Sequence, residues 1–362
     1  MTSTATPPPS PPPAAVLRGH AAEVTAVRIT PWLDEQQLPL LLSAGGDGEV
    51  RLWSLRTHRA VASVAAHGGA GGHSATVLAV HALGASTVLS QGRDGRVRAW
   101  DVADGALRGP LLELPAECYN FCACAPSPAL VAAGAPVGGS GGGTAATAAT
   151  LALPSADANE VVLWDVRARA PARTLAPSTA LGKAGMCMCV RFADDGRLLA
   201  GWEDGSLQLF DLRGGGGGGG GGSGGGGAAA AARKLHSQPL LSIDVDPAGA
   251  TAVSGAADCA LCVASLAGGE VGAPTRLDIP VTSEASGSGG VASLAVRPDR
   301  KLLAAGGWDK RVRLWQWKRW KPLAVLKQHT ETVTAVHFSA DSRWLASASN
   351  DRTIALWDVY PP

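Results

Sequence analysis

The chain has 362 residues, of which 47 are glycine and 24 are proline, and this high share indicates many turns and few long helices. With 31 basic and 30 acidic residues, the formal net charge is +1, which argues against a basic nucleic-acid binder as a description of the whole chain. Hydrophobic residues make up 46%, which is enough to fill a sizeable core.

The first 13 residues form a proline-rich segment that lacks the charged and apolar regions of a secretory signal, so we expect a disordered tail at residues 1–13. No apolar run is long enough to span a bilayer, and we expect no membrane partner. The seven cysteines are an odd number, which favours reduced thiols in the cytosol or nucleus. Cys259-x-x-Cys262 lacks a second ligand pair, so we expect structural cysteines, no metal and no cofactor.

One pattern recurs along the chain: a strand-like run, a turn with aspartate, and a second run that ends in a large apolar residue. The turn aspartates of the clear copies are Asp47, Asp94, Asp204, Asp309 and Asp351. The large apolar residue that ends the second run, called here the slot, falls at positions 53, 100, 164, 210, 264, 315 and 357. Two copies are weaker: the turn aspartate is displaced in the copy that ends at 164, and the tryptophan is replaced by alanine in the copy that ends at 264. A blade of four antiparallel strands needs about 40–45 residues, so seven units fit.

A second recurring motif supports the same repeat register. It is a short segment, before most of the turn aspartates, in which small apolar and polar residues alternate. It ends at Arg28, His81, Arg191, Arg297 and His337, and its small apolar residues are typical of a strand with one buried face. Together these features resemble the WD-repeat family over residues 14–362. The resemblance implies an all-β, seven-bladed propeller.

The last copy stops after its third strand, whereas residues 14–18 look like the missing outer strand followed by a Gly-His turn. We therefore expect the N-terminal strand to close the ring, which removes an exposed sheet edge. Flexible low-complexity insertions are expected at about 135–149 in blade three and 213–233 in blade four. In blade three, either Leu130-Val131 or residues 151–153 could be the second strand.

In the WD-repeat family, a histidine, a serine, an aspartate and a tryptophan of one blade form a buried hydrogen-bond network. The matching residues here are His20, Ser43, Asp47 and Trp53; Ser90, Asp94 and Trp100, with His67 or His73; and His329, Ser347, Asp351 and Trp357. Such a set could also be a hydrolase triad. Because it recurs in several blades and no Gly-x-Ser-x-Gly elbow frames the serine, we interpret it as structural and expect no catalytic residues.

Several stretches resemble one subfamily in particular, the G-protein β-subunit-like proteins also known as ASTRA-associated WD-repeat proteins. These stretches are residues 89–94, 201–206, 297–309, 321–326 and 356–361. The resemblance implies a non-catalytic scaffold of nucleus and cytoplasm, linked to the ASTRA chromatin assembly and to the co-chaperone pathway that matures phosphatidylinositol-3-kinase-like kinases. Alternatives are a G-protein β-like signalling adaptor, or a plant-type regulator of development and plasmodesmal transport. Only 13 residues precede the propeller, so no coiled-coil helix for a G-protein γ subunit is expected.

Two surfaces are candidates for binding a protein partner. The face that carries the aspartate turns, called here the narrow face, has Arg93, Trp202 and Trp308 where most turns have small residues, so these are either exposed anchors or covers for neighbouring backbone. On the opposite, wide face, two loops of blade six are expected to bring cations and a tryptophan together. These are Arg297, Arg300, Lys301, Lys318, Arg319, Trp320 and Lys321, with Arg343 and Trp344 nearby. They form either solvated loops or a docking site for an acidic segment.

Overall fold

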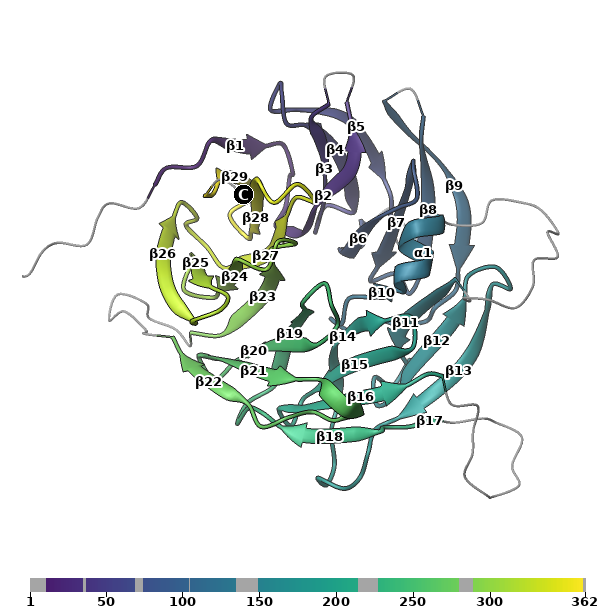
Figure 1. The fold of residues 1–362 in the computed structure, drawn as a ribbon. Helices are drawn as coiled ribbons and strands as arrows, with labels where there is room; N and C mark the ends of the chain where they lie inside the picture. Colours follow the sequence, from purple (N-terminus) through teal and green to yellow (C-terminus); the bar gives the residue numbers. More distant parts are fainter. Residues whose placement is uncertain are drawn as a thin grey trace, which may run out of the picture.

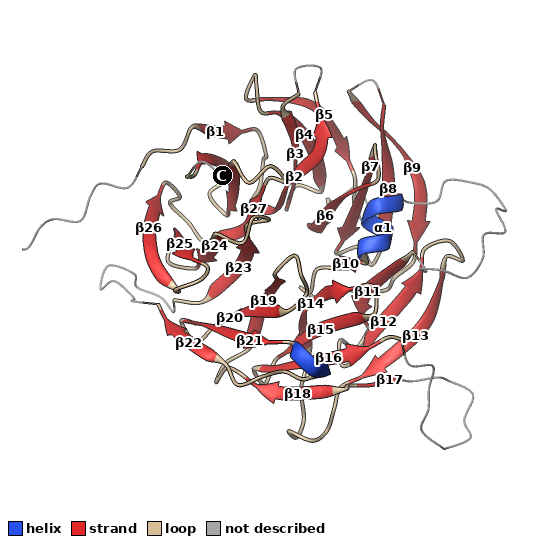
Figure 2. Ribbon diagram, viewed as in Figure 1, coloured by secondary structure: helices blue, strands red, loops and turns tan. Residues whose placement is uncertain are grey.

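The computed structural model describes residues 11–34, 37–68, 74–103, 105–134, 149–213, 227–279 and 289–360. Seven sheets are arranged as blades around a central axis, as Figure 1 shows, and their strands pair antiparallel except for one short parallel strand at the edge of blade 3. Figure 2 shows that strands dominate, with a single short α-helix, α1 (Pro128–Ala133), and a 3-10 turn, η1 (Ala267–Gly269), in the described ranges. Neither helical element has the length that crossing a membrane would require. The predicted seven-bladed propeller is confirmed.

Blades 1 to 4 follow one another along the chain, except that the fifth strand of blade 3 comes from the segment between the third and fourth strands of blade 4. In each blade the first strand is innermost. Blade 1 contains β2 (Val24–Leu33), β3 (Pro39–Gly45), β4 (Glu49–Ser54) and β5 (Arg59–Ala65). Blade 2 contains β6 (Val77–Leu83), β7 (Thr87–Gly92), β8 (Val97–Ala103) and β9 (Ala106–Leu114). Blade 3 contains β10 (Ala125–Pro126), β11 (Thr150–Pro154), β12 (Val161–Asp165), β13 (Ala170–Ala176) and β17 (Gly227–Ala228). Blade 4 contains β14 (Cys187–Asp194), β15 (Arg197–Trp202), β16 (Ser206–Asp211) and β18 (Ala231–Lys234).

Blades 5 and 6 repeat this arrangement, and blade 7 takes its outer strand from the other end of the chain. Blade 5 contains β19 (Leu240–Val245), β20 (Thr251–Ala256), β21 (Ala260–Ser265) and β22 (Thr275–Asp278). Blade 6 contains β23 (Val291–Val296), β24 (Leu302–Gly307), β25 (Arg311–Gln316) and β26 (Lys321–Lys327). Blade 7 contains β27 (Val333–Phe338), β28 (Trp344–Ser349), β29 (Thr353–Asp358) and β1 (Ala15–Arg18).

The ring is closed by β1, which pairs antiparallel with β29 from Ala15 opposite Leu356 to Arg18 opposite Thr353. In Figure 1 this purple N-terminal strand lies along the outside of the yellow C-terminal blade. Leu17 is buried between blades 7 and 1, in a cluster with residues of both. Pairing and packing therefore act together at the closure.

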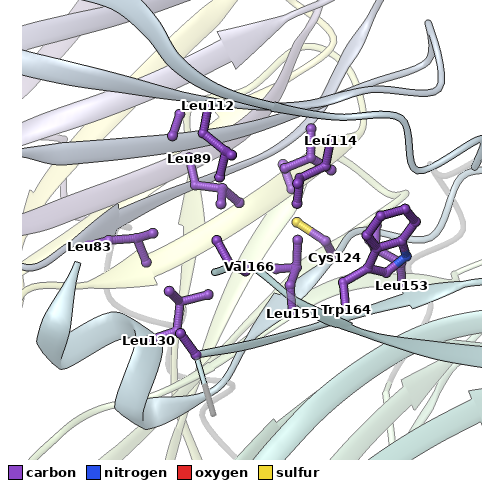
Figure 3. Packing of buried hydrophobic residues seen from close by; sticks show 14 residues of the cluster. Leu83, Leu89, Leu112, Leu114, Cys124, Leu130, Leu151, Leu153, Trp164 and Val166 are labelled. Atoms are coloured by element: carbon purple, nitrogen blue, oxygen red, sulfur yellow. The ribbon is translucent and has the colours of Figure 1, made fainter. Parts of the chain in front are cut away.

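The hydrophobic core consists of clusters between neighbouring blades. Figure 3 shows one of them, in which Leu89 of blade 2 packs with Leu151 and Trp164 of blade 3. All seven slots of the repeated motif lie in or at the end of third strands and are buried, including Ala264, where the tryptophan is missing. Sheets with two covered faces explain why the third strands contain so many consecutive apolar residues.

Blade 3 resolves the alternative that the sequence left open. Its second strand is β11, whereas Leu130 and Val131 belong to α1, which begins after the capping residue Ser127. The insertions expected at 135–149 and 213–233 lie mostly outside the described residues, as does most of the tail at 1–13. The predicted end of the second insertion at residue 233 is wrong. Gly227–Ala228 form β17 at the edge of blade 3, and β18 begins at Ala231 as the outer strand of blade 4, because these residues pair with the neighbouring strands.

Candidate functional site

The histidine network of blade 1 links three segments of the chain. The Nδ1 of His20 donates to the carboxylate of Asp47 at 2.9 Å, and its Nε2 accepts from the Ser43 hydroxyl at 2.7 Å. The indole N–H of Trp53 donates to the same serine oxygen at 2.8 Å. Since a carboxylate can only accept, Nδ1 must carry the proton, and the chain of donors is ordered in one direction.

The same network is present in blades 2 and 7. In blade 2, where the sequence allowed two histidines, it is His67 that joins Ser90 and Asp94, and Trp100 donates to Ser90; His73 lies outside the described residues. The blade 7 network consists of His329, Ser347, Asp351 and Trp357. Each hydrogen bond contributes about 0.5–1.5 kcal/mol, and together they hold the inner loop of a blade to its second and third strands.

Blade 5 has a fourth network that the sequence analysis missed. His236 donates to Asp258 at 3.0 Å and accepts from Ser254 at 2.8 Å. Alanine stands at position 264 in place of the tryptophan of the motif, and without the tryptophan the motif was not recognised. A spacing signal was available, because His236 precedes Asp258 by 22 residues and His329 precedes Asp351 by the same 22 residues.

These networks do not have the geometry of a hydrolase site. The serines at their centres, Ser43, Ser90 and Ser347, are each 0% exposed, so no substrate could approach their hydroxyl groups. In the described ranges, no group of three or more histidine, cysteine, aspartate or glutamate side chains is arranged to hold a metal ion. The networks therefore stabilise the blades, and candidate functional surfaces lie elsewhere.

We expect Asp94 to make stability depend on acidity. Burial alone would raise the pKa of its carboxyl group, but hydrogen bonds from His67 and Arg98 lower this pKa to about 2. A pKa depressed below the unfolded value of about 3.9 stabilises the fold above that value, and the contribution is lost as pH falls from about 4 to 2. Urea unfolding should show wild type losing ~2 kcal/mol more than Asp94→Asn over this range. Equal losses in both proteins would contradict this assignment.

The interpretation of Trp202 as an exposed anchor on the narrow face is wrong. This residue ends β15, its side chain is 0% exposed, and it packs in the cluster that contains Cys187 and Phe210. Trp202 precedes its turn aspartate by two residues, whereas Arg93 and Trp308 precede theirs by one. Because successive side chains along a strand point to opposite faces of the sheet, this shift of one residue points the side chain of Trp202 into the core.

The equivalent position in blades 1 and 2 shows what Trp202 replaces. There the residues are Gly45 and Gly92, and a Cβ atom on either would lie 3.0 Å or 2.2 Å from the network histidine of its blade. No described histidine bonds to Asp204 of blade 4. The indole of Trp202 therefore fills the space that a network histidine takes in the other blades.

The other two narrow-face candidates differ in exposure. Trp308 is half-buried, because its ring lies over Gly290, where a Cβ would come within 2.7 Å of the indole. This is the covering role that the sequence analysis left open. Arg93 is exposed, and its guanidinium lies 4.6 Å from the centre of the Phe121 ring, within cation–π distance.

Arg93 leads to an apolar patch that the sequence analysis did not single out. Phe121 is 73% exposed and Tyr119 is 56% exposed, and Met186 on the next inter-blade connection is also exposed. Arg93, Tyr119 and Phe121 are called here the rim patch. Backbone bonds join both connections to the narrow-face turns, from Glu117 N to Gly95 O and from Glu203 N to Met186 O. A hint was present in the sequence, since two of its few aromatic residues other than tryptophan stand together outside any repeat motif.

The wide-face cluster of blade 6 is smaller than expected. Arg297 is 1% exposed; it forms a bidentate ion pair with Asp299 and donates to the carbonyl groups of Val359 and Tyr360. The prediction that Arg297 belongs to an exposed patch is therefore wrong. Its guanidinium anchors the end of blade 7 instead.

The two loops of blade 6 that carry most of the remaining wide-face residues are adjacent. The backbone N–H of Trp317 donates to Lys301 at 2.9 Å, which joins the two loops of blade 6. Arg300 and Lys301 form ion pairs with Asp246 and Asp299. Trp320 packs edge-on against Trp317 and is only partly exposed, while Lys318, Arg319 and Lys321 are exposed without an ion pair to a described carboxylate. Arg343 is paired with Asp358 and lies over Trp344.

Comparison with known proteins agrees with the fold. A family model described as "WD domain, G-beta repeat" matches residues 12–54, 280–316 and 320–358. The chain is 32% identical to "Guanine nucleotide-binding protein subunit beta-like protein 1" of Mus musculus, over 98% of both chains.

Two further relatives come from fungi. The chain is 27% identical to "ASTRA-associated protein 1" of Verticillium alfalfae, over 99% of this chain and 95% of the relative. A shorter segment is 41% identical to "Target of rapamycin complex subunit wat1" of Schizosaccharomyces pombe, over 19% of this chain and 22% of that protein.

Proposed function

We propose that this chain, which belongs to the WD-repeat family of guanine nucleotide-binding protein subunit beta-like proteins, is a non-catalytic scaffold that binds protein partners in a multi-subunit assembly. The observation that carries this proposal is the rim patch. Phe121 and Tyr119 expose more than half of their surface side by side on the narrow face, whereas the serines of the histidine networks are fully buried.

The finer proposal is that the assembly is of the ASTRA type. The similarity to ASTRA-associated protein 1 extends over nearly the whole of both chains, so all seven blades have a counterpart there. A role in chromatin regulation or in maturing kinases of the TOR type would place the protein in the nucleus and the cytoplasm. The match to the target of rapamycin complex subunit supports this less, because it covers 71 residues of a repeated fold.

The rim patch has the composition of a protein-binding surface. Aromatic residues, methionine and arginine are enriched at the centres of interfaces, and lysine is depleted there. Arg93 stacks on Phe121 at 4.6 Å, which limits the movement of both side chains before a partner arrives. Tyr119 is held in the same way, because its ring lies against Gly95, where a Cβ would come within 2.7 Å. A preorganised apolar surface loses less conformational entropy on binding.

We expect Phe121→Ala to weaken partner binding without loosening the propeller. A hot-spot aromatic contributes about 2 kcal/mol to an interface, which corresponds to roughly a 30-fold loss of affinity. Tagged full-length wild type and variant should be purified from cells of the source organism and their partners compared by quantitative mass spectrometry. The variant should lose the subunits of the assembly and keep the wild-type melting temperature.

Two controls make this result specific. Val61→Ala removes an exposed apolar side chain from outer strand β5 and should leave the captured partners unchanged. Charge reversal of Lys318, Arg319 and Lys321 to glutamate tests the wide face. If this triple variant loses the partners while Phe121→Ala retains them, docking on the rim patch is ruled out and the wide face is the binding surface. If wild type itself captures no ASTRA-type subunit, the finer proposal fails.

A further inference from the structure

The innermost strands line a central channel with a volume of about 630 Å³. At one equivalent position of these innermost strands, five of the seven blades have an ionisable residue that lines the channel. The residues at this position are Arg28, His81, Arg191, Asp244 and His337, while blades 3 and 6 have Ala125 and Ala295. In the sequence, four of these residues only mark the ends of a repeated strand motif, and the fold brings them together.

Most of this ring connects one blade to the next. His81 donates from Nε2 to the carbonyl of Cys124 at 3.0 Å, and Nδ1 of His337 accepts from the Ile29 N–H at 3.1 Å. Asp244 accepts from the Val296 N–H at 2.7 Å and forms an ion pair with Arg191 at 2.9 Å. These four side chains have a structural role that accounts for them.

Arg28 is different from the other members of the ring. Its guanidinium has no hydrogen bond and no ion pair with any described residue, although it has five N–H donors. Burial and the nearby Arg191 lower the pKa of Arg28 to about 10, although the Asp244 carboxylate opposes this shift, so the group is still charged near neutral pH. A partly buried cation that makes no hydrogen bond is costly, and an anion that accepts its N–H groups would reduce that cost.

The charges of the ring leave room for an anion. Burial and the two arginines hold the pKa of His81 and of His337 well below the usual histidine value, so both imidazoles are neutral. Two guanidinium groups then face the single carboxylate of Asp244. No other charged side chain lines the channel in the described ranges, so one positive charge is uncompensated.

We propose that the central channel binds the phosphate group of a small phosphorylated molecule, with Arg28 as its main ligand. The planar fork of an arginine matches two phosphate oxygens. His337 offers a second donor, because its Nδ1 accepts from Ile29 and its proton is therefore on Nε2. A channel of about 630 Å³ is within the range of small-molecule sites, so it accommodates more than a bare ion.

The test is isothermal titration calorimetry on the full-length protein with inorganic phosphate and with glucose 6-phosphate, at ionic strength matched with chloride. We expect both to bind, with the ester at least as tight, and acetate to bind at least about tenfold more weakly. Arg28→Gln should weaken both phosphates at least about tenfold, whereas Arg319→Gln, which removes an exposed charge on the wide face, should change nothing. Failure of phosphate to bind wild type, or equal binding by acetate, would overturn the proposal.

Thermal unfolding separates a ligand role for Arg28 from a structural one. In chloride alone, Arg28→Gln should melt at the wild-type temperature or above it, because it removes an uncompensated cation. Phosphate should raise the melting temperature of wild type and not that of the variant. A variant that melts well below wild type in chloride would show that Arg28 is structural. If inorganic phosphate binds and glucose 6-phosphate does not, the proposal that the ligand is a phosphorylated molecule is wrong.

Discussion

Trp202→Ala is expected to lower the free energy of unfolding by about 3–5 kcal/mol, which is the usual cost of removing a fully buried tryptophan. The indole is 0% exposed and packs in the apolar cluster that joins blades 3 and 4. Alanine would leave a cavity there, because the strands on both sides are held by backbone pairing and cannot close over it. Urea denaturation of the purified protein measures the loss.

A second substitution at this position isolates packing from hydrogen bonding. The indole N–H of Trp202 is buried without a hydrogen-bond partner, so Trp202→Phe removes an unsatisfied donor together with part of the ring. It should therefore cost much less than Trp202→Ala. Trp308→Ala is the matched control on a half-exposed tryptophan one register position away, and its loss should also be smaller. A Trp202→Ala protein as stable as wild type would contradict the buried position.

The propeller could be predicted from the sequence because its signal is repeated. The aspartate turns and the buried slots recur in register, so even Ala264 could be assigned to a third strand without its tryptophan. Surface exposure carries no such repetition. Trp202 and Trp308 occur in similar turns, but Trp202 lies one residue further from its aspartate, at the end of β15, and this register places its side chain on the buried side.

The exposure of charged side chains in the loops was predicted less well, because their partners come from distant parts of the sequence. The sequence shows that Arg297 lies near other cations, but its carboxylate partner Asp299 and the carbonyl groups of Val359 and Tyr360 come together only through the fold. The channel ring has the same origin. Arg28, His81 and His337 are more than 50 residues apart in sequence, and the closure of the ring makes them neighbours.

Deletion of residues 1–18 is expected to open the ring and to destabilise the whole propeller. The deletion removes the pairing of β1 with β29 and the buried side chain of Leu17, which joins blades 7 and 1. A buried leucine contributes about 2–5 kcal/mol, and each lost backbone bond adds about 0.5–1.5 kcal/mol. It also exposes β29 as a sheet edge that can pair with another chain. Thermal unfolding should show a midpoint lower by at least about 5 °C, and size-exclusion chromatography should show aggregates.

The matched control is deletion of residues 1–10, which leaves β1 and the hydrogen bond from Ala14 to Leu356 in place. It should unfold like wild type. A synthetic peptide with the sequence of residues 12–20 should bind the 1–18 deletion, raise its melting temperature and reduce aggregation, because it supplies the missing strand. Leu17→Asp in the same peptide should abolish the rescue, since a charge would enter the apolar cluster between the blades. If the 1–18 deletion stays monomeric with the wild-type midpoint, β1 contributes little and the other six blades hold the ring closed.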